Sequence, residues 1–149
     1  MNDAYATAIR LLARREHGAT ELVQKLTRKG MSEQDAQAAL AACQQQGLQS
    51  DERFTESYCR SRVRQGYGSK RIEQELKQRQ IDDDIIHQAL AAYEDEWLGY
   101  AKMVREKKFG HEKASSFLEE QKHKQFLHYR GFASEIINQL TKLYEDEKL

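Results

Sequence analysis

The chain has 149 residues, of which 39% are hydrophobic and 32% are charged, and its 24 basic side chains balance its 24 acidic ones. The hydrophobic content excludes a disordered chain, and a formal net charge of zero predicts no overall attraction to nucleic acid. Because the sequence has no proline and is dominated by straight-chain helix formers, it predicts an all-α fold.

The N-terminal residues, MNDAYATAIRLLARR, contain no uninterrupted apolar core of the kind that a signal peptide needs. No apolar run approaches the length that crosses a membrane, so we expect a cytoplasmic protein with no membrane partner. Cys43 and Cys59 are too few and too far apart for a disulfide framework or a zinc site. Both are expected to be buried thiols, which suit a reducing cytoplasm.

The first predicted helix carries an apolar stripe at helical spacing, made by Tyr5, Ala6, Ile9, Leu12 and Ala13. Gly18 then predicts a stop, and Thr20 a new N-cap. Gly30 predicts the end of the second helix. Ser32, followed three residues later by an acid, predicts the cap of a third helix, which Gly47 ends.

The second third of the chain shows the same punctuation. Asp51 or Ser50 is expected to cap its first helix, and the GYGS run at residues 66–69 predicts a turn. Asp82 or Asp83 is expected to start the third helix. The acids at residues 82–84 could be imagined as a metal site, but carboxylates at a helix N-terminus offset its dipole, and we favour that interpretation.

The last third opens with a helical stripe made by Trp97, Tyr100, Ala101 and Val104. A shift of about 50 residues places ELVQKLTRKGMSEQDAQAAL over RIEQELKQRQIDDDIIHQAL, and KHKQFLHYRGFASEIINQL is a diverged third copy. We therefore predict three tandem three-helix repeats, similar to helix-turn-helix units, at residues 1–48, 49–93 and 94–149. Such short units are expected to stack into an elongated, curved array.

Charge is sorted within each repeat. Residues 10–29 carry six basic and two acidic side chains, whereas residues 31–52 carry four acids and no base. Residues 53–79 carry eight basic and three acidic side chains, and residues 80–99 carry six acids and no base. Such blocks are often solvated faces that neutralise one another, but their recurrence favours a basic stripe able to lie along a polyanion.

Helical geometry selects candidate contact residues in the second repeat. At 100° per residue, Arg53, Arg60 and Arg64 fall within about 40° of one another. Lys70 and Lys77 lie on the next helix, opposite its apolar positions. These five cations are predicted to contact DNA phosphates or an acidic protein surface.

Other residues of this repeat are expected to serve the structure. Arg62 falls on the apolar side of its helix, so we predict a partly buried guanidinium held by a carboxylate such as Asp51 or Glu75. Asp51, Phe54 and Tyr58 are likewise predicted to be structural.

Tyr67, between two glycines, could stack on a base or meet a partner, although the glycines themselves fit a plain junction between helices. The chain shows no histidine pair at ligand spacing, no nucleophile motif and no carboxylate pair in an apolar setting. We therefore predict no catalytic residues, no metal site and no cofactor.

The segments LLARREHGATELVQKL, GLQSDERFTESYCRSRVRQGYGSKRIEQELKQRQI and HYRGFASEIINQL together resemble the RecX family, over nearly the whole chain. DERF followed by RSR and GYG is a specific signal. The sequence departs from the family at Ser69, where relatives often carry proline, and at residues 111–124, which match poorly.

This resemblance implies a negative modulator of the RecA recombinase that binds the RecA filament on single-stranded DNA. It implies suppression of strand exchange, ATP hydrolysis and coprotease activity, together with a secondary, direct affinity for single-stranded DNA. Two alternatives remain open from the residues alone. One is a helix-turn-helix-like regulator that reads one duplex sequence, and the other is a helical scaffold that docks proteins without binding DNA.

Overall fold

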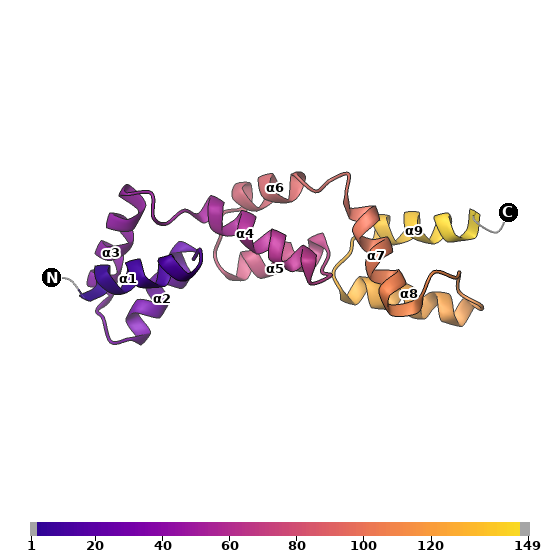
Figure 1. The fold of residues 1–149 in the computed structure, drawn as a ribbon, viewed down its shortest axis with the longest axis horizontal. Helices are drawn as coiled ribbons and strands as arrows, with labels where there is room; N and C mark the ends of the chain where they lie inside the picture. The colour runs from indigo at the N-terminus through magenta and orange to yellow at the C-terminus, as the bar shows by residue number, and fades with distance from the viewer. Residues whose placement is uncertain (1–2, 147–149) are drawn as a thin grey trace. The chain divides into compact units, whose positions relative to one another are not determined.

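The computed structural model describes residues 3–146, and these residues form an all-helical fold, as predicted. The outermost residues of the first and third predicted repeats, 1–2 and 147–149, lie outside this description. The described residues form nine helices, which are labelled in Figure 1: α1 (Asp3–Arg14), α2 (Ala19–Arg28), α3 (Glu33–Gln45), α4 (Asp51–Arg64), α5 (Ser69–Gln78), α6 (Asp83–Ala91), α7 (Trp97–Phe109), α8 (Phe117–Tyr129) and α9 (Ser134–Asp146).

Most of the predicted helix boundaries are confirmed. The Ser32 hydroxyl accepts a hydrogen bond from the Asp35 backbone N–H and caps α3. The Ser50 hydroxyl accepts one from the Arg53 N–H, so Ser50 and not Asp51 is the side-chain cap of α4. At the start of α2 the prediction was wrong, because Gly18 and not Thr20 is the N-cap.

The repeat is visible in the backbone that follows the second helix of each copy. Gly30, Gln80 and Gly131 all adopt positive φ angles, of 99°, 59° and 94°, at places that the sequence alignment puts in register. A left-handed residue at this place stops the helix and turns the chain towards the next one. Gln80 adopts this conformation although it is not glycine.

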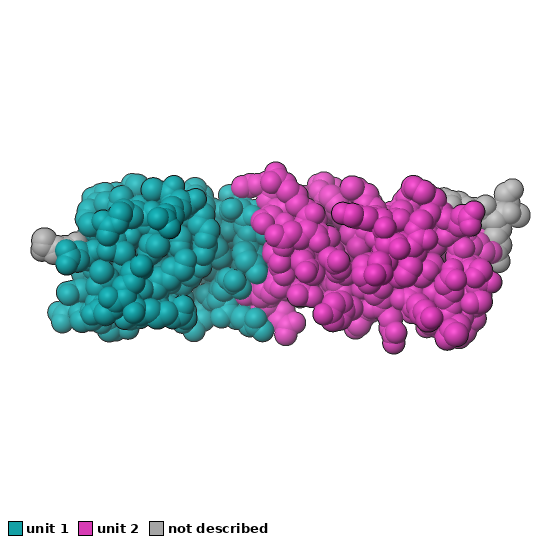
Figure 2. Space-filling model, turned by 60° about the horizontal axis from the view of Figure 1, so that its bottom comes forward, with its two compact units in different colours: residues 1–58, 76–89 teal, residues 59–75, 90–149 magenta. Residues whose placement is uncertain are grey.

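The described residues divide into two compact units, drawn in different colours in Figure 2. Unit 1 extends to Tyr58 and takes in Leu76–Ala89, whereas unit 2 comprises Cys59–Glu75 and the chain from Leu90 onwards. The division passes through α4, α5 and α6. The predicted repeat boundaries, and the stacking of the repeats into an elongated, curved array, stay predictions.

Unit 1 has a core in which small side chains let helices approach closely. Ala4 and Ala8 of α1 are 1% and 0% exposed and belong to the same buried cluster as Ala36, Ala39 and Cys43 of α3. The stripe predicted for α1 was therefore wrong in phase. Its large apolar residues suggested one face, but close packing on α3 selects the face with the small residues.

Unit 2 contains α7, which contacts both α8 and α9 (Figure 1), and a tight crossing between two turns. The Gly68 N–H donates to the Arg130 carbonyl at 2.8 Å, and the Lys70 N–H donates to the Gly131 carbonyl at 2.8 Å. A Cβ atom at Gly68 would lie 2.5 Å from the Phe132 nitrogen, which no real contact allows. Glycine therefore permits the α4–α5 turn to rest on the α8–α9 turn.

Candidate nucleic-acid interface

Two of the predicted contact residues, Arg53 and Lys77, lie in unit 1, where both are exposed. The Arg53 guanidinium is already engaged, because it donates to the Glu16 carboxylate at 3.1 Å and to the Gly47 carbonyl at 2.8 Å. These bonds tie the start of α4 to the preceding linker and to the end of α1. Arg53 therefore has fewer donors left for a partner than the sequence suggested.

Arg60, Arg64 and Lys70 are exposed residues of unit 2. Of these, Arg64 lines a groove of about 400 Å³ between the end of α4, one side of α7 and the end of α8. Arg60 and Lys70 lie outside its lining. Their predicted contacts, like those of Arg53 and Lys77, stay predictions.

The groove is basic and partly apolar. Its charged side chains are Arg64, Lys107, Lys108 and Arg130, and no carboxylate lines it. Among the described ion pairs none neutralises these four cations. The remaining wall is formed chiefly by Val63, Tyr100, Met103, Val104 and Phe126. Cations beside aromatic rings are the combination that binds phosphates and bases of a single strand, and both rings of this groove are half-buried.

One ring of the groove has two cations near it, one on α7 and one at the C-cap of α8. The Lys108 ammonium lies 5.5 Å from the centre of the Phe126 ring, and the Arg130 guanidinium lies 5.3 Å from it. Both distances are within the range of cation–π attraction. The Arg130 guanidinium also donates to the Gln65 carbonyl at 2.9 Å, which holds it against the α4–α5 turn.

The alternation of rings and cations continues away from the groove. The Arg130 guanidinium lies 5.0 Å from the centre of the Tyr67 ring, and that of Arg71 lies 4.3 Å from the same centre. The Arg71 guanidinium is also 5.8 Å from the Tyr129 ring, which is 74% exposed. We call this set the cation–aromatic row: Lys108, Phe126, Arg130, Tyr67, Arg71 and Tyr129.

Arg62 is not a member of the cation–aromatic row, but it contacts one of the rings of the row. Its guanidinium lies 4.0 Å from the Tyr67 ring centre and forms two hydrogen bonds, of 2.9 and 2.7 Å, with the Glu75 carboxylate. Glu75 also accepts from Arg71 at 3.2 Å. The ion pair predicted for Arg62 is thus present with Glu75 and not with Asp51. One carboxylate serves two guanidinia here, so the row keeps a net positive charge.

The other residues predicted to be structural have contacts inside unit 1. The Asp51 carboxylate accepts the Ala19 N–H at 2.8 Å, and Phe54 is 3% exposed and faces Gly18. The Tyr58 ring lies 4.7 Å from the Arg79 guanidinium. Their structural role stays a prediction, and these contacts support it.

Sequence reasoning missed Arg71, Lys107, Lys108, Phe126, Tyr129 and Arg130. A local signal existed, because Phe126, Tyr129 and Arg130 have the i, i+3, i+4 spacing of one helix face. What the sequence could not supply is the packing that brings this face of α8 to the α4–α5 turn and to α7.

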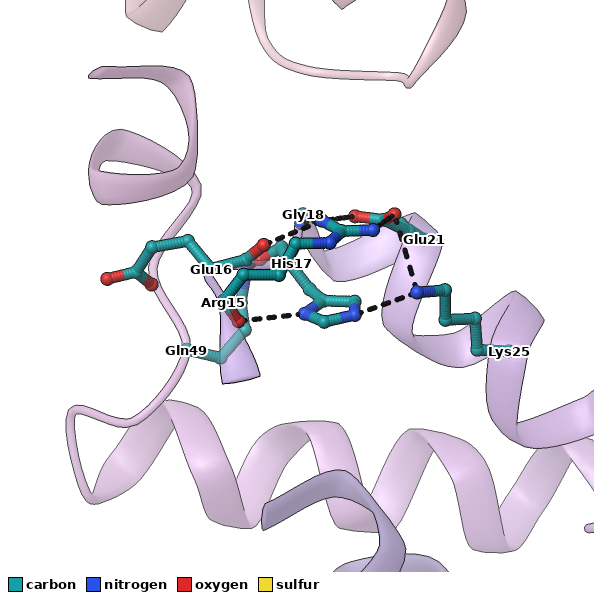
Figure 3. Close-up of polar contacts among 7 residues, drawn as sticks. All are labelled: Arg15, Glu16, His17, Gly18, Glu21, Lys25 and Gln49. Atoms are coloured by element: carbon teal, nitrogen blue, oxygen red, sulfur yellow. Dashed lines mark hydrogen bonds and ion pairs between the residues drawn. The ribbon is translucent and has the colours of Figure 1, made fainter. Parts of the chain in front are cut away.

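Unit 1 contains a buried polar cluster around His17, which is 1% exposed (Figure 3). The Nδ1 atom lies 3.0 Å from the Arg15 carbonyl and must donate to it, so Nε2 accepts from the Lys25 ammonium at 3.0 Å. The His17 carbonyl in turn accepts from the Gln49 side chain. The neutral imidazole therefore joins α2 to the turn before it.

Stability of unit 1 is expected to fall on acidification. Burial lowers the pKa of His17 below 6.5; the hydrogen bond to the Arg15 carbonyl opposes this, and the charges of Arg15 and Lys25 add to the lowering while that of Glu21 resists it. The unfolded chain then binds the proton before the native state does, so stability is lost as pH falls below about 6.5.

The check is thermal unfolding between pH 7.5 and 5.5 for the wild type and for His17→Gln, which has no titrating ring. The wild type should lose more melting temperature on acidification than the variant. An identical pH dependence in both would contradict the assignment of the neutral, Nδ1-protonated ring.

Residues 3–146 give little support for a metal site, a reactive thiol or a membrane-spanning helix. No group of three or more histidine, cysteine, aspartate or glutamate side chains is placed to hold a metal ion there. Cys43 and Cys59 are buried and are not joined in a disulfide, and burial raises the pKa of Cys43. Within the same residues no helix is both long enough and apolar enough to cross a membrane.

Family models match three consecutive segments of the chain. Residues 4–43 match "RecX, first three-helix domain", residues 50–90 match "RecX, second three-helix domain", and residues 94–141 match "RecX, third three-helix domain". The matches confirm the predicted organisation into three tandem three-helix units.

Comparison with individual proteins points to the same family. The chain is 47% identical over 142 residues to "Regulatory protein RecX" of Legionella pneumophila (strain Corby), covering 95% of each chain. It is 44% identical to the protein of that name from Vibrio vulnificus (strain CMCP6), covering 88% of this chain and 86% of the other. The crystal structure of RecX from Lactobacillus salivarius superposes with a TM-score of 0.81 at 25% identity, covering 95% and 94%.

Proposed function

Because the chain belongs to the RecX family of regulatory proteins, we propose that it is a negative modulator of RecA that acts by binding. The chain is a regulatory protein and not an enzyme. In this proposal it binds the RecA filament on single-stranded DNA, in the helical groove of the filament, and inhibits the recombinase, ATPase and coprotease activities. Direct binding to single-stranded DNA is weaker and secondary.

The observation that supports this proposal is the basic groove of unit 2. Arg64, Lys107, Lys108 and Arg130 line it without a carboxylate, in a chain whose formal net charge is zero. A balanced chain that concentrates unneutralised cations in one groove gains attraction to a polyanion at that place. A RecA filament on single-stranded DNA offers such a polyanion in its DNA phosphates.

In this proposal RecA is inhibited because the bound chain occupies space on the filament. A chain that contacts phosphates through the groove of unit 2 and a RecA surface elsewhere occupies space that the second DNA strand and incoming subunits need. Each contact is weak, but once one contact has formed, the other binding surfaces of the same chain are held close to the filament. The chain therefore binds more tightly than any single contact would allow. This explains how a surface of modest size can hold a filament in an inactive state.

The test is a salt titration of binding to a random single-stranded oligonucleotide, with and without RecA, and to a random duplex. We expect the RecA filament to be bound more tightly than free single strands, with an affinity for free strands that falls steeply as salt rises. Tight binding to one duplex sequence would instead support a sequence-specific regulator. Binding without DNA and without salt dependence would support a protein-docking scaffold, and both results contradict the proposal.

A further inference from the structure

The cation–aromatic row ends in a ring that the fold leaves open. Tyr129 is the last residue of α8, and 74% of it is exposed. Tyr67, in the middle of the row, is contacted by three guanidinia at 4.0, 4.3 and 5.0 Å. Among the described contacts Tyr129 has one cation near it, the Arg71 guanidinium at 5.8 Å. The inner ring is thus enclosed, whereas the outer one keeps a face for a ligand.

The ring contact described for Tyr129 is with a charged side chain, Arg71. Arg71 is held by Glu75, 3.2 Å away, and stands between Tyr67 and Tyr129. Arg130, the next residue along the chain, is fixed by the Gln65 carbonyl. An exposed ring with one positioned guanidinium beside it is placed to take a flat group that is attached to an anion.

We propose that Tyr129 is a base-stacking residue, through which the chain selects single-stranded nucleic acid over duplex. An unpaired base has a free π-face that can stack on an aromatic ring, and any base can do so. In a duplex both faces of each base are already covered by its neighbours. Single strands and duplexes both present phosphates, so phosphate contacts alone cannot distinguish them. Stacking on Tyr129 requires an unpaired base and therefore supplies the preference for single strands.

This inference rests on the proposed function, because the cations of the groove and the row hold the phosphates while Tyr129 holds the base. Phe126 lies one turn earlier on α8 and lines the groove. Arg130 reaches both the Phe126 ring and the Tyr67 ring. A strand that lies along the row therefore meets cations from Lys108 to Arg71 before its base reaches Tyr129.

The test measures binding of the full chain, without RecA, to a labelled oligo-dT, to the same strand with abasic sites, and to a duplex of equal length. The protein variants are Tyr129→Ala, Tyr129→Phe and the matched control Phe117→Ala. Phe117 lies at the other end of α8, is 76% exposed and is not part of the row.

Tyr129→Ala is expected to weaken binding to oligo-dT by about 5- to 150-fold, the range for loss of one base–aromatic stack. Its binding to the duplex should stay within about two-fold of the wild type, as should binding of Tyr129→Phe and Phe117→Ala to every probe. Removing the bases should weaken the wild type and should add little to the effect of Tyr129→Ala, because both changes remove the same contact.

The proposal is overturned if Tyr129→Ala binds oligo-dT like the wild type. It is equally overturned if this variant loses affinity for oligo-dT, the abasic strand and the duplex to the same extent, because the ring would then only maintain a charged surface. The outcome is independent of RecA. A chain that shows this selection but leaves RecA activity unchanged would contradict the proposed function and leave the stacking role of Tyr129 intact.

Discussion

Substitution of Gly131 by alanine is expected to destabilise unit 2 by roughly 2 to 5 kcal/mol. The residue has a φ angle of 94°, and a left-handed conformation costs an alanine about 1–2 kcal/mol. An added Cβ atom would also lie 2.7 Å from the Arg71 nitrogen, so the two crossing turns must separate. Overpacking of this kind adds about 1–3 kcal/mol.

Gly30 is the matched control for this change. It occupies the corresponding place in the first repeat with a φ angle of 99°, but nothing lies within 4 Å of its added Cβ atom. Gly30→Ala therefore isolates the backbone strain, of about 1–2 kcal/mol. Equal losses of stability in the two variants would show that the close approach of the turns is unimportant.

Urea unfolding followed by far-ultraviolet circular dichroism measures both losses. Trp97, the single tryptophan of the chain, adds a probe of unit 2, because its ring packs edge-on against Phe132 with centroids 6.4 Å apart. Gly131→Ala should shift the tryptophan signal to lower urea together with the helical signal. Gly30→Ala should leave the tryptophan transition near that of the wild type.

The sequence predicted what depends on residues close in the chain. Ser32 caps α3, and left-handed glycines end α2 and α3, because the cap side chain and the turn glycine act on backbone within a few residues. The alignment of two segments at a shift of about 50 residues, with a diverged third copy, was sufficient to predict three tandem three-helix units.

The features that the sequence could not predict depend on packing between helices that are distant in the chain. The buried face of α1 is the one with Ala4 and Ala8, and only the close approach of α3 makes small residues preferable there. The basic groove takes Arg64 from the end of α4, but its other cations come from α7 and α8, more than 40 residues later. A helical projection compares only cations on the same helix, so it cannot predict that cations from different helices line one groove.

Reversal of three groove charges, Arg64→Glu, Lys107→Glu and Lys108→Glu, is expected to abolish inhibition of RecA. The groove then carries three carboxylates beside Arg130 and repels phosphates instead of attracting them. These three side chains are exposed, so the helices that carry them should remain folded. The matched control is Lys102→Glu, Lys122→Glu and Lys142→Glu, which makes the same change in net charge at exposed residues of unit 2 outside the groove.

The decisive measurement is the ATPase rate of RecA on single-stranded DNA, titrated with the wild type, the groove triple variant and the control triple variant. The wild type and the control variant should suppress the rate at similar concentrations, and the groove variant should leave it near the uninhibited value. Failure of the wild type to lower the rate, or full inhibition by the groove variant, would contradict regulation of RecA through this surface.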